Sequence, residues 1–544
     1  MANLSHLKRQ RMLAFLDTIR QEHKDDDDVL IALGEIESEL NAKKYGLVWE
    51  QHEEAVDVKM RTHIPVFTED AGKEITCDES GVYNFLLEGD NLHSLRLLEK
   101  THSGKVDMIY IDPPYNTGNK DFIYDDACVS SDDGYFHSKW LSFMAERLQI
   151  AKSLLSDNGI ILISIDETEY SNLKLLCDDI FGERNAMGSF IWKSRQVVDS
   201  RNKTHISNDH EYILVFAKNI ENASILGKEV SQEKYSNPDN DPRGPWMSNS
   251  ILGLANAEQR PNLHYDLIDP KTGIVYPCNP STGWRFSKET MAQKIAEGRI
   301  LFPAKKSGRP REKKFYNEIS SKFTGLSTVL PETVGYTLNG SREITQILGN
   351  RAFDFPKPVS LIQFLVAQCL NKNAVILDFF AGSGTTAHAV LKQNLEDGGN
   401  RRFILCTNNE NHICEEVTYE RIRRVIDGYG DVAGIPANLK YYRTDFVARD
   451  EEYLSDALLE HIAEMIQLEH GIKIDGQRYI MVMSDEEADE LEQHWNEYTD
   501  VQAMYVSKNV LFTAAQVACF KETPQFIIPD NYFKFELREE GEVW

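Results

Sequence analysis

A short acidic turn is the stretch of this sequence best suited to chemistry. The apolar run 105–111 is typical of a buried parallel strand, and Asp112-Pro113-Pro114-Tyr115 follows it directly. The two prolines lack an N–H and have fixed φ, so they end the strand and stiffen the turn. We expect a carboxylate, a carbonyl and an aromatic ring at the carboxyl edge of a sheet, where open α/β sheets bind ligands. Two acceptors and a ring face suit an exocyclic amine on a flat base.

A second candidate loop lies far along the chain. The apolar run 375–378 predicts a strand that ends in Asp378, and the sequence Phe-Phe-Ala-Gly-Ser-Gly-Thr-Thr leads into a helix from Ala387. Glycines at a tight strand-to-helix turn let a ligand approach the backbone closely. No Gly-Lys-Ser/Thr follows, which argues against a phosphate loop. The candidate ligand-binding residues of this loop are Asp378, Phe380, Gly382 and Gly384.

Together the two motifs resemble those of DNA amino-methyltransferases. Alone, Asp-Pro-Pro-Tyr could be an ordinary structural turn, but the wider string 111–122 is similar to the modification subunit of type III restriction–modification systems. The loop at 378–384 matches the Asp-x-Phe-x-Gly-x-Gly motif of S-adenosylmethionine-dependent enzymes. The catalytic strand precedes the cofactor strand, which is the order of the β class. The resemblance covers 45–445.

The resemblance implies an α/β fold: a circularly permuted, Rossmann-like S-adenosylmethionine-dependent methyltransferase sheet, with an inserted target-recognition domain and a small C-terminal α/β module. Strands are expected at 83–90, 106–111, 160–166 and 212–217, and again at 375–378 and 402–407. The sheet closes only if the last two strands insert beside the first two. The expected parts are a helical arm (1–75), the catalytic half (76–225), target recognition (226–350), the cofactor half (351–445) and an acidic assembly module (446–544).

The resemblance also assigns roles to residues. It makes Asp112, Pro113, Pro114 and Tyr115 catalytic and adds Asp90, Lys357 and Glu410 to the cofactor site. Glu410 follows a strand, where a carboxylate can bind ribose hydroxyls. Asp90 could equally be the N-cap of the next helix, and Glu410 a helix-initiating acid. His210-Glu211 resembles a family feature, for which a structural role is expected.

The composition fits a cytoplasmic globular protein of 544 residues, long enough for several domains. No apolar run approaches the ~20 residues of a membrane span, and no secretory segment opens the chain. The eight cysteines form no Cys-x-x-Cys pair, so neither a zinc site nor a disulfide framework is expected. The resemblance implies no metal and no covalent nucleophile.

The charge is unevenly distributed. The net charge is −27, but residues 191–345 hold 22 basic and 17 acidic side chains, whereas 445–544 hold 7 basic and 23 acidic. A polyanion responds to the local field, so the middle of the chain is the expected DNA face. Its basic run could also be a solvated loop. The candidate DNA-binding residues are Lys305, Lys306, Arg309, Arg311, Lys313 and Lys314.

The leading hypothesis is methylation of adenine N6 in duplex DNA after base flipping. Aspartate at the first motif position resembles adenine enzymes, because cytosine-N4 enzymes more often carry serine there. The resemblance implies a homodimer and a helicase–nuclease restriction partner. The alternatives are a stand-alone methyltransferase, an enzyme acting on RNA or cytosine, and a chain that chiefly recognises DNA for a nuclease–helicase.

Overall fold

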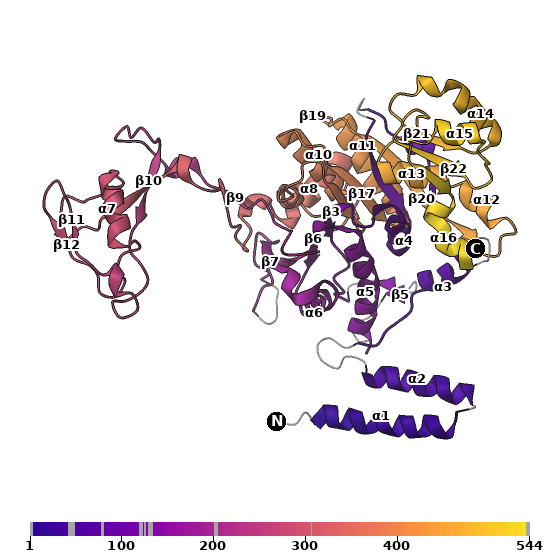
Figure 1. Cartoon of the computed structure of the whole chain (residues 1–544), viewed down its shortest axis with the longest axis horizontal. Helices are drawn as coiled ribbons and strands as arrows, with labels where there is room; N and C mark the ends of the chain where they lie inside the picture. Colours follow the sequence, from indigo (N-terminus) through magenta and orange to yellow (C-terminus); the bar gives the residue numbers. More distant parts are fainter. Residues whose placement is uncertain are drawn as a thin grey trace. The chain divides into compact units, whose positions relative to one another are not determined.

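The computed structural model describes residues 4–24, 26–41, 49–77, 81–118, 123–124, 127–128, 134–200, 205–305 and 307–539. These residues divide into two compact units (Figure 1). The larger unit comprises 1–225 with 328–544, and the smaller one comprises 226–327. The larger unit carries the Asp-Pro-Pro-Tyr turn and the glycine loop.

One mixed sheet organises the larger unit. Within the described residues it has nine strands, in the order β1-β20-β2-β17-β16-β3-β6-β8-β7. The stretch from β20 to β6 is parallel, while β1, β8 and β7 pair antiparallel at the two ends. The strands are β1 (His63–Glu69), β20 (Asn438–Ala448), β2 (Tyr83–Glu88), β17 (Arg402–Thr407), β16 (Val375–Asp378), β3 (Val106–Ile111), β6 (Leu155–Ile165), β8 (His210–Ala217) and β7 (Ala186–Lys193).

The permuted order expected from the sequence is confirmed. Strands β17 and β16, which come late in the chain, insert between the early strands β2 and β3. The paired residues are Leu405 with Leu86 on one side of the inserted pair and Leu377 with Ile109 on the other. The carboxyl ends of β2, β17, β16 and β3 therefore lie side by side. The loops that follow them form one continuous edge.

The sheet is apolar on both faces, as parallel sheets between two layers of helices are. Phe85, Ile109 and Ile161 belong to the cluster that also contains buried side chains of α4, α5 and α6, while their alternating neighbours, including Leu86 and Leu405, are buried as well. The helices are α3 (Ala55–Thr62), α4 (Asn91–His102), α5 (Phe136–Leu154), α6 (Tyr170–Cys177), α8 (Thr337–Leu348), α9 (Val359–Val366), α10 (Thr385–Asp397) and α11 (Glu420–Asp427); α1 (Leu4–Glu22) and α2 (Asp27–Asn41) precede them.

The structure places several boundaries differently from the sequence analysis. The segment His63–Glu69, expected in a helical arm, is an edge strand, and its Pro65 is tolerated because an edge needs only one set of ladder bonds. Strands β7 and β20 were not expected, and β6 starts at Leu155 rather than at the expected residue 160. The smaller unit ends at Ser327, so 328–350 belongs with the larger one.

The C-terminal module contains a parallel sheet, β21-β22-β23 (Tyr479–Val482, Ala503–Ser507, Gln525–Ile528), with α14 (Asp485–His494), α15 (Ala514–Cys519) and α16 (Asp530–Glu539). Tyr505 and Phe533 pack into the same cluster as the main sheet, so the module shares that core. Two consecutive helices precede this sheet, α12 (Leu454–Leu459) and α13 (Ile462–His470), which are separated because His461 leaves the helical conformation.

The smaller unit has its own apolar cluster, which includes Ile251, Trp284 and Met291. Its tryptophan and tyrosine side chains at 284 and 276 are buried in that cluster. Its elements are β9 (Lys228–Glu229), β10 (Trp246–Ser250), β11 (Leu267–Ile268), β12 (Val275–Tyr276), α7 (Lys288–Ala296), β13 (Ile300–Leu301), β14 (Arg311–Phe315) and β15 (Phe323–Thr324). Among the helices of the described residues, none is both long and apolar enough to cross a membrane.

Candidate active site

The Asp-Pro-Pro-Tyr turn leaves β3 at the carboxyl edge of the sheet, as expected. Trp140 of α5 donates its indole N–H to the Pro114 carbonyl at 2.8 Å, which ties the turn to a buried helix. The next residue, Asn116, has a φ of 59° and donates to the fully buried carboxylate of Glu169 at 2.6 Å. A left-handed asparagine held by a buried carboxylate fixes the direction in which the chain leaves the turn.

A buried lysine contacts the aspartate of this turn. Lys357 precedes α9, and its Nζ lies 2.8 and 2.7 Å from the two carboxylate oxygens of Asp112. The same Nζ lies 3.4 Å from Glu211 and 5.0 Å from the centre of the Tyr115 ring. Burial alone would lower the pKa of Lys357, but the carboxylates of Asp112 and Glu211 outweigh it, so the pKa is raised and the amine is charged. Lys357, expected in the cofactor site, therefore belongs to one cluster with Asp112, Tyr115 and Glu211.

Glu211 is the residue of this cluster that the sequence analysis did not assign to the site. It lies at the start of β8, and its Oε2 is 2.9 Å from the Tyr115 hydroxyl, which lies 2.9 Å from Oδ1 of Asp112 as well. The His-Glu pair before the strand was the available signal, but a pair of letters does not reveal that its carboxylate reaches across the sheet to a turn 96 residues away in sequence.

The Asp112 carboxylate keeps room for a ligand. An ionised carboxylate offers about four acceptor positions. Within the described residues, Oδ1 accepts from Tyr115 and Lys357, and Oδ2 accepts from Lys357. One position therefore remains on Oδ2, and the side chain is 27% exposed. The cluster can thus accept one N–H from an incoming amine.

The glycine loop lies beside this turn, because β16 and β3 are neighbours. Gly384 is left-handed, with a φ of 73°, and a Cβ there would lie 3.2 Å from the Thr418 side chain, which explains why glycine is needed. The hydroxyl of Thr385, the first residue of α10, donates to the Lys357 carbonyl at 3.3 Å. The loop and the lysine segment are therefore positioned together.

Asp378 shapes the loop from inside. Its side chain is 2% exposed, one oxygen accepts from the backbone N–H of Phe380, and the other accepts from the Thr386 hydroxyl. Burial raises the pKa of Asp378 to about 7, and Asp112 adds to the rise. Both oxygens are therefore engaged by the loop itself, and Asp378 fixes the conformation of the loop.

The remaining candidate cofactor residues sit on neighbouring loops of the same edge. Asp90 caps α4 by accepting from the Leu92 N–H at 2.8 Å, so its alternative role as N-cap is real, yet its side chain is 36% exposed. Glu410 follows β17 and is exposed at the start of a short 3₁₀ turn. The half-buried Phe380 ring lies 5.8 Å from Phe143.

The basic run in the smaller unit divides into exposed and buried members. Lys305, Arg309, Arg311 and Lys314 are exposed, and Lys306 lies outside the described residues. Lys313 is 7% exposed and pairs with Asp239 and Asp241, so it is not available to DNA. Adjacent residues of a strand point to opposite faces, so Lys313 can be buried while Lys314 is exposed.

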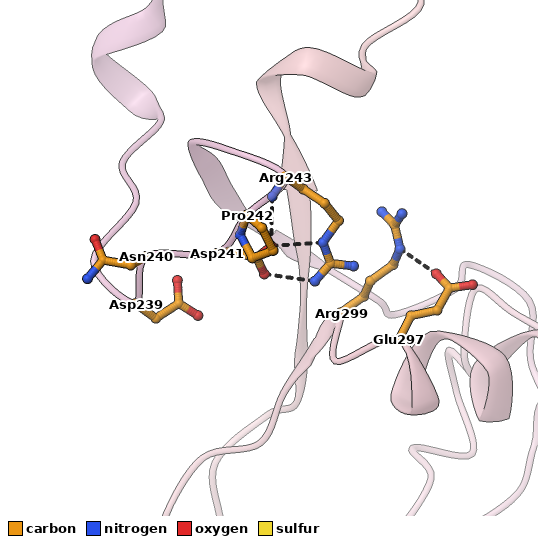
Figure 2. A pocket seen from close by; sticks show the side chains of 7 residues that line it. All are labelled: Asp239, Asn240, Asp241, Pro242, Arg243, Glu297 and Arg299. Carbon is orange, nitrogen blue, oxygen red and sulfur yellow. Dashed lines mark hydrogen bonds and ion pairs between the residues drawn. The ribbon is translucent and has the colours of Figure 1, made fainter.

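A depression of about 620 Å³ is lined in part by Asp239 and Asp241, the two partners of Lys313 (Figure 2). Figure 2 shows Arg243 bonded to Asp241 and Arg299 bonded to Glu297. The N···O distances of these ion pairs are 2.7 and 2.6 Å. Arg299 also binds Glu318. Since these charged groups satisfy one another, the depression is better explained as a structural ion-pair cluster than as a binding site.

Comparison with known proteins identifies the class that this sheet order and its two loops indicate. The chain belongs to the DNA methylase family, which matches residues 106–419. It is 34% identical over 433 residues to the Mod subunit of the type III restriction-modification enzyme StyLTI of Salmonella typhimurium, a match that covers 72% of this chain and 65% of that one.

Two further relatives have sequence identities slightly below and slightly above this value. The EcoP15I Mod subunit of Escherichia coli is 30% identical over 430 residues, covering 68% of this chain and 65% of that one. The type II methyltransferase M.KpnI of Klebsiella pneumoniae is 36% identical over 374 residues, covering 63% and 88%. The resemblance to type III modification subunits is confirmed, and the chain spans 65% of the length of the two Mod subunits.

Proposed function

We propose that this chain transfers a methyl group from S-adenosylmethionine to the N6 amine of adenine in duplex DNA. The observation that carries the proposal is the cluster around Asp112, in which one carboxylate position is left for an N–H while Lys357 and Tyr115 hold the group in place. The Asp112 oxygen and the Pro113 carbonyl accept hydrogen bonds from the two N–H groups of the amine, and the Tyr115 ring stacks on the flipped base. Positioning supplies most of the rate.

The residues at the carboxyl edge fit S-adenosylmethionine, which would supply an electrophilic methyl group. The cofactor carries two cationic groups, a carboxylate and ribose hydroxyls. Exposed Glu410 suits the hydroxyls and Asp90 the ammonium group, while Phe380 offers a ring face. The loop through Gly382 and Gly384 opens α10, whose N-terminus favours a carboxylate. Lys357 is the further candidate for that carboxylate.

The smaller unit, 226–327, is proposed to recognise the target sequence. Its exposed basic residues (Lys305, Arg309, Arg311 and Lys314) suit contacts with phosphates. The similar proteins are named as Mod subunits of type III restriction-modification enzymes, which favours such a role for this chain. We also propose a homodimer, as the family resemblance of the motifs implies, and DNA cleavage by another chain. A stand-alone role is the second candidate, favoured by the similarity to a type II methyltransferase.

The direct test is incubation of the purified chain with tritiated S-adenosylmethionine and unmodified genomic DNA, followed by nucleoside analysis. Label in N6-methyladenine is expected. Label in N4-methylcytosine would contradict the choice of base. Bound cofactor with no label on DNA, also after addition of the chain's genomic neighbours, would contradict the proposed substrate. Label that appears only after that addition would show that a second subunit is needed.

The first variant to measure is Asp112→Ala. It removes the acceptor for the amine, so methylation should fall below detection while S-adenosylmethionine still binds, as followed by calorimetry. The matched control is Asp157→Ala, which removes an exposed carboxylate from the same unit. Intact turnover in Asp112→Ala would contradict the role assigned to Asp112.

A further inference from the structure

The Tyr115 hydroxyl occupies an unusual position between two carboxylates. It lies 2.9 Å from Oδ1 of Asp112 and 2.9 Å from Oε2 of Glu211. A phenol has one proton and can donate it to one of them only. The other contact joins two acceptors, and it becomes a hydrogen bond only if that carboxyl group itself carries a proton. The cluster is therefore short of one proton.

The ionisation of the other groups does not fill this gap. The pKa of Tyr115 is raised well above its ordinary value, by burial first and then by the two carboxylates, so the hydroxyl keeps its proton. Lys357 is charged, and its ammonium lies 2.7 Å from Asp112 and 3.4 Å from Glu211. One ammonium against two carboxylates leaves the cluster one positive charge short of neutrality.

Methylation of an amine releases one proton, a point that rests on the proposed function. The nitrogen lone pair forms the new N–C bond, the electron pair of the broken S–C bond stays with sulfur, and one N–H bond must then break with its pair returning to nitrogen. The reaction thus releases one proton, and the cluster lacks one proton and one positive charge.

We propose that the released proton leaves through Asp112 and the Tyr115 hydroxyl to Glu211, which is its terminal acceptor. The Asp112 carboxylate takes the proton from the amine, and a half-turn about its Cβ–Cγ bond, a soft torsion, presents the new O–H to the phenol. Tyr115 accepts this proton and passes its own to Glu211. Asp112 is again a carboxylate, and Glu211, which is 17% exposed, returns the proton to water.

The relay is tested by a double-variant cycle on the full chain. Tyr115→Phe keeps the ring that stacks on the base and removes only the hydroxyl, while Glu211→Gln keeps the shape and removes the acceptor. Each should lower the single-turnover rate constant on the order of 10²-fold, the usual contribution of general acid–base groups. Because both changes break one relay, the double variant should be no slower than the slower single variant.

One readout separates a relay from a merely structural role, and a second tests the hydrogen bond on which the relay depends. The rate constant in D₂O should fall relative to H₂O for the wild type, and this solvent isotope effect should change in both single variants. Without any substrate, the shift of the urea midpoint in the double variant should differ from the sum of the shifts in the two single variants, because both substitutions remove the same hydrogen bond. The matched controls are Tyr212→Phe on the same strand and Glu221→Gln on the surface, which should match the wild type in all three measurements.

The outcomes are distinguishable from a failure of the proposed function. If wild-type protein transfers no methyl group to DNA, the proposed function fails. If it does, but the two substitutions multiply independently or leave the single-turnover rate unchanged, the relay is overturned and the methyltransferase proposal stands. Additive shifts in the urea midpoint would also overturn it, since the Tyr115–Glu211 hydrogen bond would then be absent.

Discussion

At the scale of single residues, the number of hydrogen-bond partners of each carboxylate decides whether it has an acceptor position left for a ligand. Lys357 holds Asp112 through both oxygens and leaves one acceptor position, and Asp378 spends both of its oxygens inside its own loop. The two aspartates are thus assigned different work by burial. Asp112 is partly exposed and keeps an acceptor position, whereas Asp378 is buried and shapes the backbone of the neighbouring loop.

The buried Asp378 should make stability depend on pH. Its pKa is about 7 in the folded chain and near 3.8 when unfolded, so the folded state holds an extra proton between these values. The stability that this protonation contributes is fully present below pH 3.8 and is lost as pH rises through 7. We expect the wild type to lose on the order of 2 kcal/mol more than Asp378→Asn between pH 5.5 and 8, since one pKa unit is about 1.4 kcal/mol.

Urea unfolding of both proteins at the two pH values measures this difference. The substitution keeps a side-chain oxygen for the Phe380 N–H, so the loop should be retained. Equal losses in the wild type and the variant would show that Asp378 is ionised throughout the range.

At the scale of elements, helix α8 positions Lys357 by packing against its backbone. A Cβ on Gly340 would lie 2.1 Å from the Pro356 carbonyl oxygen and 2.9 Å from the Lys357 carbonyl carbon. Glu343 of the same helix accepts the Val359 N–H at 2.9 Å. The helix thus packs directly against the segment that carries Lys357.

Gly340→Ala should therefore push that segment away from Asp112. Because backbone cannot yield as a side chain can, we expect a loss of about 1–3 kcal/mol in the free energy of unfolding and a lower methylation rate. Urea unfolding and the single-turnover assay measure the two effects. Gly34→Ala, on α2, has no atom within 4 Å of the new Cβ and should be at least as stable as the wild type. A fully active, fully stable Gly340→Ala would contradict the packing described.

Elements and site were predictable to different degrees. The Asp-Pro-Pro-Tyr turn and the glycine loop could be predicted because strand periodicity and glycine placement are local signals. The edge strands β1 and β7 could not, since a proline at 65 and a glycine at 188 weaken that signal. Contacts such as Glu211 with Tyr115 depend on which strands become neighbours, which no local pattern contains.

At the scale of the whole molecule, charge separates the parts. The net charge of −27 is concentrated towards the C-terminus, and the smaller unit supplies exposed cations. Two neighbouring lysines on β14 show that a count of charged residues does not reveal which of them are exposed. Lys313 is paired inside the unit, whereas Lys314 faces outward.

These neighbours make a matched test of the DNA face. Lys314→Ala should weaken DNA binding and reduce the slope of log affinity against log salt by about 1, the value for one lost phosphate contact. Lys313→Ala leaves Asp239 and Asp241 without their shared cation, so it should lower the melting temperature of the chain with little direct effect on that slope.

Fluorescence anisotropy across a salt series and thermal unfolding measure the two quantities. The reverse pattern, a salt effect from Lys313 and a stability effect from Lys314, would place DNA on another face.

The insertion of β16 and β17 between β2 and β3 has a consequence for synthesis on the ribosome. When β2 and β3 have emerged, each still lacks the neighbour that completes it, and that neighbour is made only when residues 375–407 are translated. At about 5–20 residues per second, the nascent chain waits for tens of seconds with these edges open. A prematurely terminated chain therefore cannot assemble the glycine loop beside the catalytic turn, so an unfinished chain lacks the complete site.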